Sequence, residues 1–362
     1  MGTYIDQQTR RRIMRTGLTA HDTNLACPGY VLFGPKFGRS IHLIDVEGKE
    51  VHRWELDYIS GEYGYLLPSS NLFFMGKDPD MTEVLFPAWP IVRGGIMQEV
   101  DINNKVVWEY RDPYMHHDAR RTGSGGVIYL AIERLSSEVA RKFRGGGRDR
   151  PMWADFIIEV DKDGNRIWEW HASEHLDPAV DRPRGTGAGF ELTHCNTIVV
   201  LDDNHIMIGS AALSLIAIIQ KSSGDIIWRV GSETLSGQHD CNPLPNGNVL
   251  VYCNTGRADQ RIGGIRGSSV IEIDRQTKEV IWEYADTPRY NFYSPIISGA
   301  RRLPNGNTLI TEGVFGRMFQ VTPGKEVVWE YINPYFFPNH RGVEMNEVFR
   351  AIHYTKEELP FL

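Results

Sequence analysis

Short apolar runs alternate with polar turns along this chain, and one pair of runs recurs. Its clearest copy consists of residues 270–274, a polar turn, and residues 279–284. Runs rich in β-branched and aromatic residues on both sides of a polar turn predict a β-hairpin. The second run of each copy carries a tryptophan, and successive tryptophans are 47 to 60 residues apart. The six copies are centred on Trp54, Trp108, Trp168, Trp228, Trp282 and Trp329.

A second recurring stretch of sequence, here called the second pattern, follows the hairpins. It supplies two more strands to each repeat. Three of its copies run into a Leu-Pro turn and then an apolar run such as residues 248–252. Each repeat therefore contains four strands, and four-stranded units at this period are typical of propeller blades. The sequence predicts an all-β fold, a six-bladed β-propeller with long loop insertions over one mouth. The five internal copies begin near Tyr63, His116, Thr193, Gln238 and Ser298.

The two ends of the chain are predicted to share one blade. Residues 349–354 repeat the second pattern, and an early run near Val31 has no hairpin partner of its own. Pairing these two runs would close the ring and leave no bare sheet edge. We expect residues 1–26 to be a polar N-terminal lead-in, which could hold a short helix at residues 7–14, and residues 27–362 to form a single six-bladed propeller domain. The repeated tryptophans would fill the wedges between neighbouring sheets as core residues.

Four connections between strands are longer than simple turns. They span residues 77–95, 134–155, 172–192 and 285–297. Long loops in compact folds usually carry function or are disordered. Their aromatic residues Trp89, Tyr290 and Tyr293 are candidates for substrate binding, as the lining of an entrance for a flat apolar ligand. The alternative is that these loops form a contact between copies of the chain in a homo-oligomer.

Composition narrows the range of partners and locations. The 362 residues carry a formal net charge of −7, so nucleic acid is not an expected partner. No run of about 20 apolar residues could span a bilayer, and no apolar stretch follows the basic residues at 10–12, so we expect no membrane association, no export signal and a cytoplasmic location. The four cysteines lack CxxC spacing, and reduced thiols are expected.

Candidate chemistry lies in the second pattern. In each internal copy of the second pattern, one residue lies five positions before the Leu-Pro turn or its equivalent, and these five residues are equivalent in the repeat. Side chains two residues apart on a strand share a face. His194, two residues before one of them, shares that face. The first strand of each blade lines the central channel, so His117, His194 and His239 are predicted to face one axial cavity. The five equivalent positions hold Glu62, His117, Asn196, His239 and Ser298.

Several interpretations of the three histidines remain open. Each alone could be a core histidine with satisfied hydrogen bonds. Together they could supply a neutral imidazole nucleophile with neighbours that stabilise charge or move protons. They could instead bind a divalent metal ion in a lyase, hydrolase or hydratase. Asp118 and Asp240 have the opposite parity, so they should anchor the strand turns rather than orient the imidazoles. His116 should also point away from the cavity by parity.

These residues and repeats resemble the arylsulfotransferase-like β-propeller family, whose motifs match His116-His117-Asp118, His194-Cys195-Asn196 and Gln238-His239-Asp240. The resemblance implies transfer of a sulfuryl group between phenols through a sulfohistidine, without a nucleotide sulfate donor. It implies that His239 becomes sulfated and that His194 and Asn196 bind the sulfuryl oxygens. It makes His117 a further active-site histidine. The shared register, and not the resemblance, makes Ser298 and Glu62 candidates for binding a small aromatic substrate.

Two departures from the family pattern affect the expected chemistry. The family places an arginine where this chain has Ala211, and a lost guanidinium removes a bidentate partner for a sulfate-like group. Enzymes of this kind are usually exported, whereas no export signal is expected here. Sulfuryl transfer through His239 is the first expectation, a metal-dependent enzyme with His117, His194 and His239 as ligands is the alternative, and a non-catalytic propeller that binds a ligand or protein is the second alternative. The missing charge could come from Arg121, Arg257, Arg301, Arg302 or Arg317.

Overall fold

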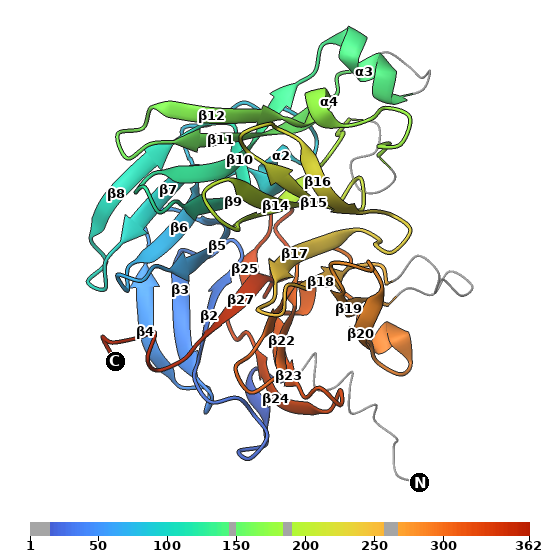
Figure 1. Cartoon of the computed structure of the whole chain (residues 1–362). Coiled ribbons are helices and arrows are strands. Elements are labelled where there is room, and N and C mark those ends of the chain that lie inside the picture. The colour runs from blue at the N-terminus through green and yellow to red at the C-terminus, as the bar shows by residue number, and fades with distance from the viewer. Residues whose placement is uncertain (1–14, 145–149, 184–189, 257–266) are drawn as a thin grey trace.

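The computed structural model of this chain describes residues 15–144, 150–183, 190–256 and 267–362, and these form a six-bladed β-propeller (Figure 1). Each blade is built on four antiparallel strands, as the repeats predict, and the sixth blade has a fifth. The first blade contains β27 (Val348–Tyr354), β2 (Tyr30–Pro35), β3 (Ser40–Asp45) and β4 (Glu50–Glu55). The second contains β5 (Ser60–Leu66), β6 (Leu72–Lys77), β7 (Gly95–Val100) and β8 (Val106–Arg111). The third contains β9 (Met115–Arg121), β10 (Val127–Arg134), β11 (Trp153–Val160) and β12 (Arg166–His171).

The other three blades follow the same order from the axis outward. The fourth contains β13 (Cys195–Val200), β14 (His205–Ser210), β15 (Leu215–Gln220) and β16 (Ile226–Val230). The fifth contains β17 (Gln238–Pro243), β18 (Val249–Cys253), β19 (Ser269–Ile273) and β20 (Val280–Tyr284). The sixth contains β21 (Gly299–Arg302), β22 (Thr308–Glu312), β23 (Arg317–Val321) and β24 (Val327–Ile332). Each sheet is covered on both faces by its neighbours, so middle strands such as β15 are apolar without alternation and almost wholly buried.

The ring is closed by the two ends of the chain, as the sequence predicts. The last strand, β27, pairs antiparallel with β2, and His353 lies opposite Val31 (Figure 1). The six inner strands β27, β5, β9, β13, β17 and β21 each contact the next around the ring. Residues that begin these strands are therefore brought to one mouth of the propeller from distant parts of the sequence.

Part of the expected N-terminal lead-in belongs to the propeller. The strand β1 (Gly17–His21) pairs with β24, with His21 opposite Trp329, and adds a fifth strand to the outer edge of the sixth blade. Its pairing covers an edge that would otherwise offer unpaired backbone groups. The helix expected at residues 7–14 lies outside the described residues.

The repeated tryptophans join neighbouring blades. In five of the six copies the indole N–H donates a hydrogen bond to a backbone carbonyl in a turn of the next blade, at 2.7–3.1 Å. Trp54 and Trp329 are buried and the other three are half-buried, and in each case the bond links adjacent sheets. Their role is structural, as expected. The donors and acceptors are Trp54 and Asp101, Trp168 and Lys221, Trp228 and Arg275, Trp282 and Pro323, and Trp329 and Val46.

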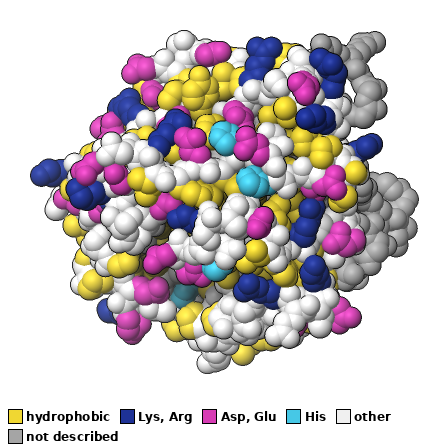
Figure 2. Space-filling view, turned by 45° about the horizontal axis from the view of Figure 1, so that its top comes forward, with side chains coloured by type: hydrophobic (Ala, Val, Ile, Leu, Met, Phe, Trp, Pro, Cys, Tyr) yellow, Lys and Arg dark blue, Asp and Glu magenta, His cyan; other side chains and the backbone are white. Residues whose placement is uncertain are grey.

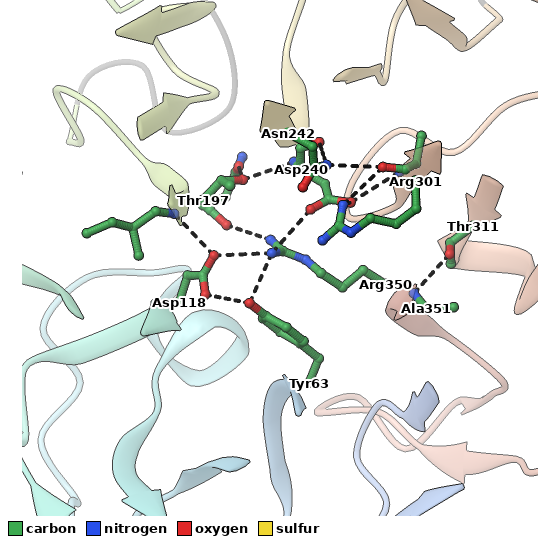
Figure 3. Close-up of polar contacts among 12 residues, drawn as sticks. Tyr63, Asp118, Thr197, Asp240, Asn242, Arg301, Thr311, Arg350 and Ala351 are labelled. Carbon is green, nitrogen blue, oxygen red and sulfur yellow. Dashed lines mark hydrogen bonds and ion pairs between the residues drawn. The ribbon is translucent and has the colours of Figure 1, made fainter. Parts of the chain in front are cut away.

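A buried charge network fills the centre of the ring (Figure 3). Arg350 of β27 is 1% exposed, and its guanidinium lies 3.1 Å from Asp118 of β9 and 3.2 Å from Asp240 of β17. It also donates to the hydroxyl of Tyr63 in β5 at 3.1 Å and to the carbonyl of Asn196 in β13 at 3.0 Å. One side chain of the closing strand therefore contacts four other blades.

The long connections carry the short helices. They include α2 (Trp89–Val92), α3 (Ser137–Arg144), α4 (Ala172–His175) and the 3-10 turn η2 (Arg289–Asn291), whereas the 3-10 turn η3 (Gly313–Phe315) joins β22 to β23. The short strands β25 (Phe337–Pro338) and β26 (Glu344–Met345) pair in the segment before β27. Parts of two connections, residues 145–149 and 184–189, lie outside the described residues.

On the face drawn in Figure 2, acidic and basic side chains are interspersed and do not form a surface of one sign. Within the described ranges, no helix has both the length and the apolar character needed to cross a membrane.

Candidate functional site

His117, His194 and His239 line one small hollow, here called the histidine cavity, together with Lys36, Glu62 and Phe349. The ring centroids of His117 and His194 are 5.0 Å apart. Those of His117 and His239 lie 6.2 and 6.1 Å from the ring of Phe349. The cavity volume is about 120 Å³, and an apolar cavity of about 150 Å³ accommodates a benzene-sized molecule. The structure thus brings the three predicted histidines to a space suited to a very small ligand.

The backbone at these positions departs from regular strand geometry. The φ angles of His117 and His194 are 51° and 49°, and that of Asp240 is 57°. The pairing of β17 with β18 is irregular between His239 and Asn242. Left-handed residues interrupt the alternation of side chains between two faces, so a parity argument cannot be carried across them.

This irregularity separates two of the predicted residues from the cavity. Among the described residues, neither Asn196 nor Ser298 belongs to the cavity lining. The Asn196 amide donates to the carbonyl of Gln238 at 2.8 Å and accepts from Thr197, so it joins β13 to β17. The Ser298 hydroxyl accepts from the backbone N–H of Gly313 at 3.0 Å. Both are buried and act in backbone contacts.

His239 is held in one tautomer by Asn254. The amide nitrogen of Asn254 donates to the carbonyls of Ser294 and Ile297, at 2.9 and 2.8 Å. Its Oδ1, 2.7 Å from Nδ1 of His239, must therefore accept the proton carried by that nitrogen. Burial lowers the pKa of His239 to about 3. A neutral imidazole with its proton on Nδ1 leaves the Nε2 lone pair free, which is the form required of a nucleophile.

His194 has the opposite electrostatic character. Its Nδ1 lies 2.7 Å from a carboxylate oxygen of Glu191, and both side chains are nearly inaccessible. Burial acts to lower the pKa of His194, but the charge and hydrogen bond of Glu191 outweigh it, so the pKa is raised. A protonated His194 presents a second N–H, on Nε2, that can donate to an oxygen anion in the cavity.

His117 is supported by a chain of buried groups. Its Nδ1 lies 2.8 Å from Nδ1 of His116, and Nε2 of His116 lies 2.9 Å from Asp155. Asp155 also accepts from the hydroxyl of Thr193 and from the backbone N–H of Cys195. Burial, followed by the neighbouring imidazoles, holds the pKa of His117 well below its usual range. His116 thus points away from the cavity, as its parity predicts, and orients the histidine that enters it.

The structure adds Lys36, which sequence reasoning missed. It follows directly after β2, is 2% exposed, and forms an ion pair with Glu62. Ala211 holds the equivalent place directly after β14, and Asn254 holds it after β18. In these three blades, the residue after the second strand therefore lies at the same mouth as the histidines. Attention to that position in the first blade would have found Lys36 from the sequence.

Ala211, the position of the expected arginine, lines the cavity. Four of the arginines considered as substitutes are engaged with acids elsewhere: Arg121 with Glu99, Arg301 with Asp240, Arg302 with Glu272, and Arg317 with Glu312 and Glu330. Arg257 lies outside the described residues. Lys36 is thus the strong cation that the described part of the chain provides at the cavity.

Two of the long loops cover the cavity, but with different residues from those expected. The loop at 77–95 contributes Ala88, Ile91 and Val92, and the loop at 285–297 contributes residues 295–297. Trp89 is buried against Phe86, and Tyr290 is 57% exposed on η2. Tyr293 is half-buried, and among the described lining residues none of these three aromatic side chains appears. The loops supply an aliphatic cover.

The metal interpretation finds no support in the arrangement of ligands. Within the described ranges, no group of three or more His, Cys, Asp or Glu side chains is placed to hold a metal ion. Asp118 and Asp240 pair with arginines, as the parity argument expected, and do not turn toward the imidazoles. Cys241 packs in the core of the fourth and fifth blades.

Comparisons with known proteins agree with this fold. Similar solved structures include a protein of unknown function from Bacteroides caccae, with a TM-score of 0.54 and 12% identity over 90% of this chain and 99% of that one. Hydrazine synthase from Kuenenia stuttgartiensis has a TM-score of 0.49 and 13% identity over 88% and 80%. A functionally unknown protein from Desulfotomaculum acetoxidans has a TM-score of 0.48 and 11% identity over 90% and 99%. At 12% identity, the likeness to the Bacteroides caccae protein shows the fold alone.

No curated protein gives a significant sequence match to this chain. Residues 88–236 match the family model for arylsulfotransferase (ASST). That segment includes His117, His194 and Ala211 and ends just before His239. The chain is thus a six-bladed β-propeller in which residues 88–236, in the second to fourth blades, are similar to the arylsulfotransferase family.

Proposed function

We propose that this protein transfers a sulfuryl group between small phenolic molecules, with His239 as the nucleophile. The observation that carries the proposal is the contrast between His239 and His194 within one cavity. Asn254 and burial keep His239 neutral with its Nε2 lone pair free, while Glu191 favours a protonated His194. Pairs of titratable groups with opposite pKa shifts are typical of acid–base and nucleophilic catalysis.

The proposed first step breaks the S–O bond of an aryl sulfate. Nε2 of His239 donates its lone pair to sulfur, and the electron pair of the breaking bond leaves with the phenolic oxygen. His194 donates its Nε2 proton to that oxygen, so the product leaves as a neutral phenol. Lys36 faces the same space and can donate hydrogen bonds to the sulfuryl oxygens.

The second step reverses the first with another phenol as acceptor. The acceptor gives its proton to His194, its oxygen attacks sulfur, and the N–S bond electrons return to His239. Glu62 lines the cavity, and its Oε1 has no hydrogen-bond partner among the described residues. That oxygen can accept a hydrogen bond from the incoming hydroxyl. The partner proposed for this site is therefore a small aromatic molecule, and neither step requires a nucleotide sulfate donor.

The experiment follows the modification of the protein itself. The purified chain is incubated with 4-nitrophenyl sulfate without an acceptor, quenched in alkali, and measured by intact mass and peptide mapping. The expected result is release of nitrophenol with one sulfuryl group on the peptide that contains His239. His239→Ala should release none, whereas the control His205→Ala, a partly exposed histidine on β14, should behave as wild type. Modification of another residue, or turnover by His239→Ala, would remove His239 from the mechanism.

A further inference from the structure

A second pocket, of about 520 Å³, opens beside the histidine cavity. Pockets of roughly 300–1,000 Å³ are typical of small-molecule sites. Its residues come from the turn after β2, the end of β6, the helix α2 and the segment that carries β25. The residues that decide its character are Phe37, Arg39, Lys77, Pro90, Phe337 and His340.

The second pocket and the histidine cavity share one wall. The amine of Lys36, in the cavity, and that of Lys77, in the second pocket, lie 5.9 and 5.4 Å from the ring centre of Phe37. Lys77 also donates to the carbonyls of Pro90 and Ile91, at 3.0 and 2.9 Å. Pro90 belongs to the pocket and Ile91 to the cavity. Single residues, such as Phe37, thus separate a molecule in the second pocket from the histidine cavity.

The second pocket is positively charged in a chain with a formal net charge of −7. Arg39, Lys77 and His340 line it, and among its described lining residues none is acidic. Burial, and then repulsion from Lys36, lowers the pKa of Lys77 to about 7, with Glu62 opposing the shift and Arg93 adding to it. Burial and the cations Arg341, Lys77 and Lys36 likewise lower the pKa of His340. An anion in the pocket would relieve this repulsion.

The walls between these charges are flat and apolar. Phe37 and Phe337 are half-buried, and Pro90 and Pro338 complete the surface. Arg39 uses one nitrogen to donate to the carbonyl of Asp57 at 2.7 Å, which leaves other guanidinium donors for a ligand. Aromatic faces with guanidinium and ammonium donors suit a planar ring that bears a carboxylate.

We propose that this second pocket binds aromatic acids, small ring compounds that carry a carboxylate. Their binding does not depend on the proposed function. The carboxylate is held by Lys77 and Arg39, and the ring packs on Phe37 and Phe337. The pocket is thus a binding site distinct from the histidine cavity.

Calorimetric titration with 4-hydroxybenzoate and with its neutral methyl ester tests the binding. Because hydrogen bonds to charged groups are the stronger ones, the acid should bind the wild type about tenfold tighter than the ester. Lys77→Met and Arg39→Gln should each remove most of this preference. The matched control Arg53→Gln changes an exposed arginine on β4 and should keep it. Equal affinity for acid and ester, or an unchanged preference in both pocket variants, would overturn the proposal.

Three further measurements test the pocket independently of whether Lys77→Met folds and of whether the protein transfers sulfuryl groups. Phe337→Ala removes only a half-buried ring, so it tests the pocket if Lys77→Met fails to fold, and it should weaken the binding of both ligands.

The preference for the acid over the ester should also fall as pH rises from about 6 to about 8.5, because Lys77 loses its proton near 7. His239→Ala should bind the acid as wild type does. Normal binding without transfer would sink the proposed function and leave the second pocket standing.

Discussion

The Nδ1 atom of His239 lies 2.7 Å from Oδ1 of Asn254. The other end of the same amide is held by two backbone carbonyls, so the oxygen cannot exchange places with the nitrogen without losing both bonds. A neutral acceptor fixes the tautomer of the imidazole without adding a charge beside it. A carboxylate in that place would favour the imidazolium ion instead. The choice of amide over carboxylate therefore keeps His239 available as a nucleophile.

Asn254→Asp is expected to raise the pKa of His239 from its value of about 3. A raised pKa means that His239 is protonated below that value and regains its lone pair only as pH rises through it. The variant should acquire an acid limb in its pH–rate profile between about pH 5 and 8, which the wild type lacks because His239 is already neutral there. Stopped assays across this range would show it, and an unchanged profile would contradict the assigned tautomer.

Glu191→Gln should change the basic limb of the pH–rate profile. Glu191 raises the pKa of His194, so the protonated form, and the activity that needs it, is present at low pH and lost as pH rises through the raised pKa. Without that charge, burial lowers the pKa and the loss should begin at lower pH. The check is a basic limb that moves to lower pH, with no acid limb appearing between about pH 5 and 8. A uniform loss of rate would indicate a structural role for Glu191 instead.

The cation of the histidine cavity offers a test in two directions. Lys36→Met should slow transfer about 10²–10³-fold, since one donor to a developing oxyanion typically accounts for about 3–4 kcal/mol. Ala211→Arg should raise the rate and partly rescue Lys36→Met, because both positions follow the second strand of a blade and line one cavity. Lys36→Met alone leaves the buried carboxylate of Glu62 without its ion-pair partner. The double variant Lys36→Met with Glu62→Gln removes that unpaired charge and serves as the control. If Ala211→Arg changes the transfer rate neither of the wild type nor of Lys36→Met, the result would argue for a different reaction.

The architecture was predictable because it repeats. Six tryptophan hairpins gave the blade count, and the run near Val31 gave the closing partner of β27. The convergence of His117, His194 and His239 also followed from their equivalent positions in successive sheets. The places of Asn196 and Ser298 did not, because left-handed residues such as His194 and Ile297 precede them and interrupt the alternation. Local backbone angles of this kind leave no mark in an apolar–polar pattern.

The cover of the cavity was predictable only in part, for a different reason. Two of the long loops do reach it, yet Trp89 turns into the protein interior and the neighbouring Ile91 and Val92 face the cavity. Which side of a short loop helix faces a ligand depends on tertiary packing around Phe86, not on local composition. Lys36 was missed because it is a single charge in a turn, and only the geometry of the mouth gives it a role.

Arg350 provides the last prediction, which concerns the stability of the ring. Its guanidinium lies between Asp118 and Asp240, and all three side chains are buried. Arg350→Met keeps most of the volume but leaves two carboxylates with less compensation, and breaking a buried pair typically costs about 3–5 kcal/mol. The urea midpoint of Arg350→Met should fall well below that of the exposed control Arg53→Gln at neutral pH.

The pH dependence of that deficit identifies its cause. Burial acts to raise the pKa of Asp240, but Arg301 and Arg350 outweigh it, so the pKa is lowered in the folded protein. The stability gained in this way is present above the pKa of an unfolded aspartate, about 4, and is lost as pH falls through the lower folded value. Without Arg350 the carboxylate protonates more readily, so the difference between variant and wild type should shrink as pH falls toward about 4. A deficit that stays constant with pH would mean that lost packing, not the unpaired charge, destabilises the variant.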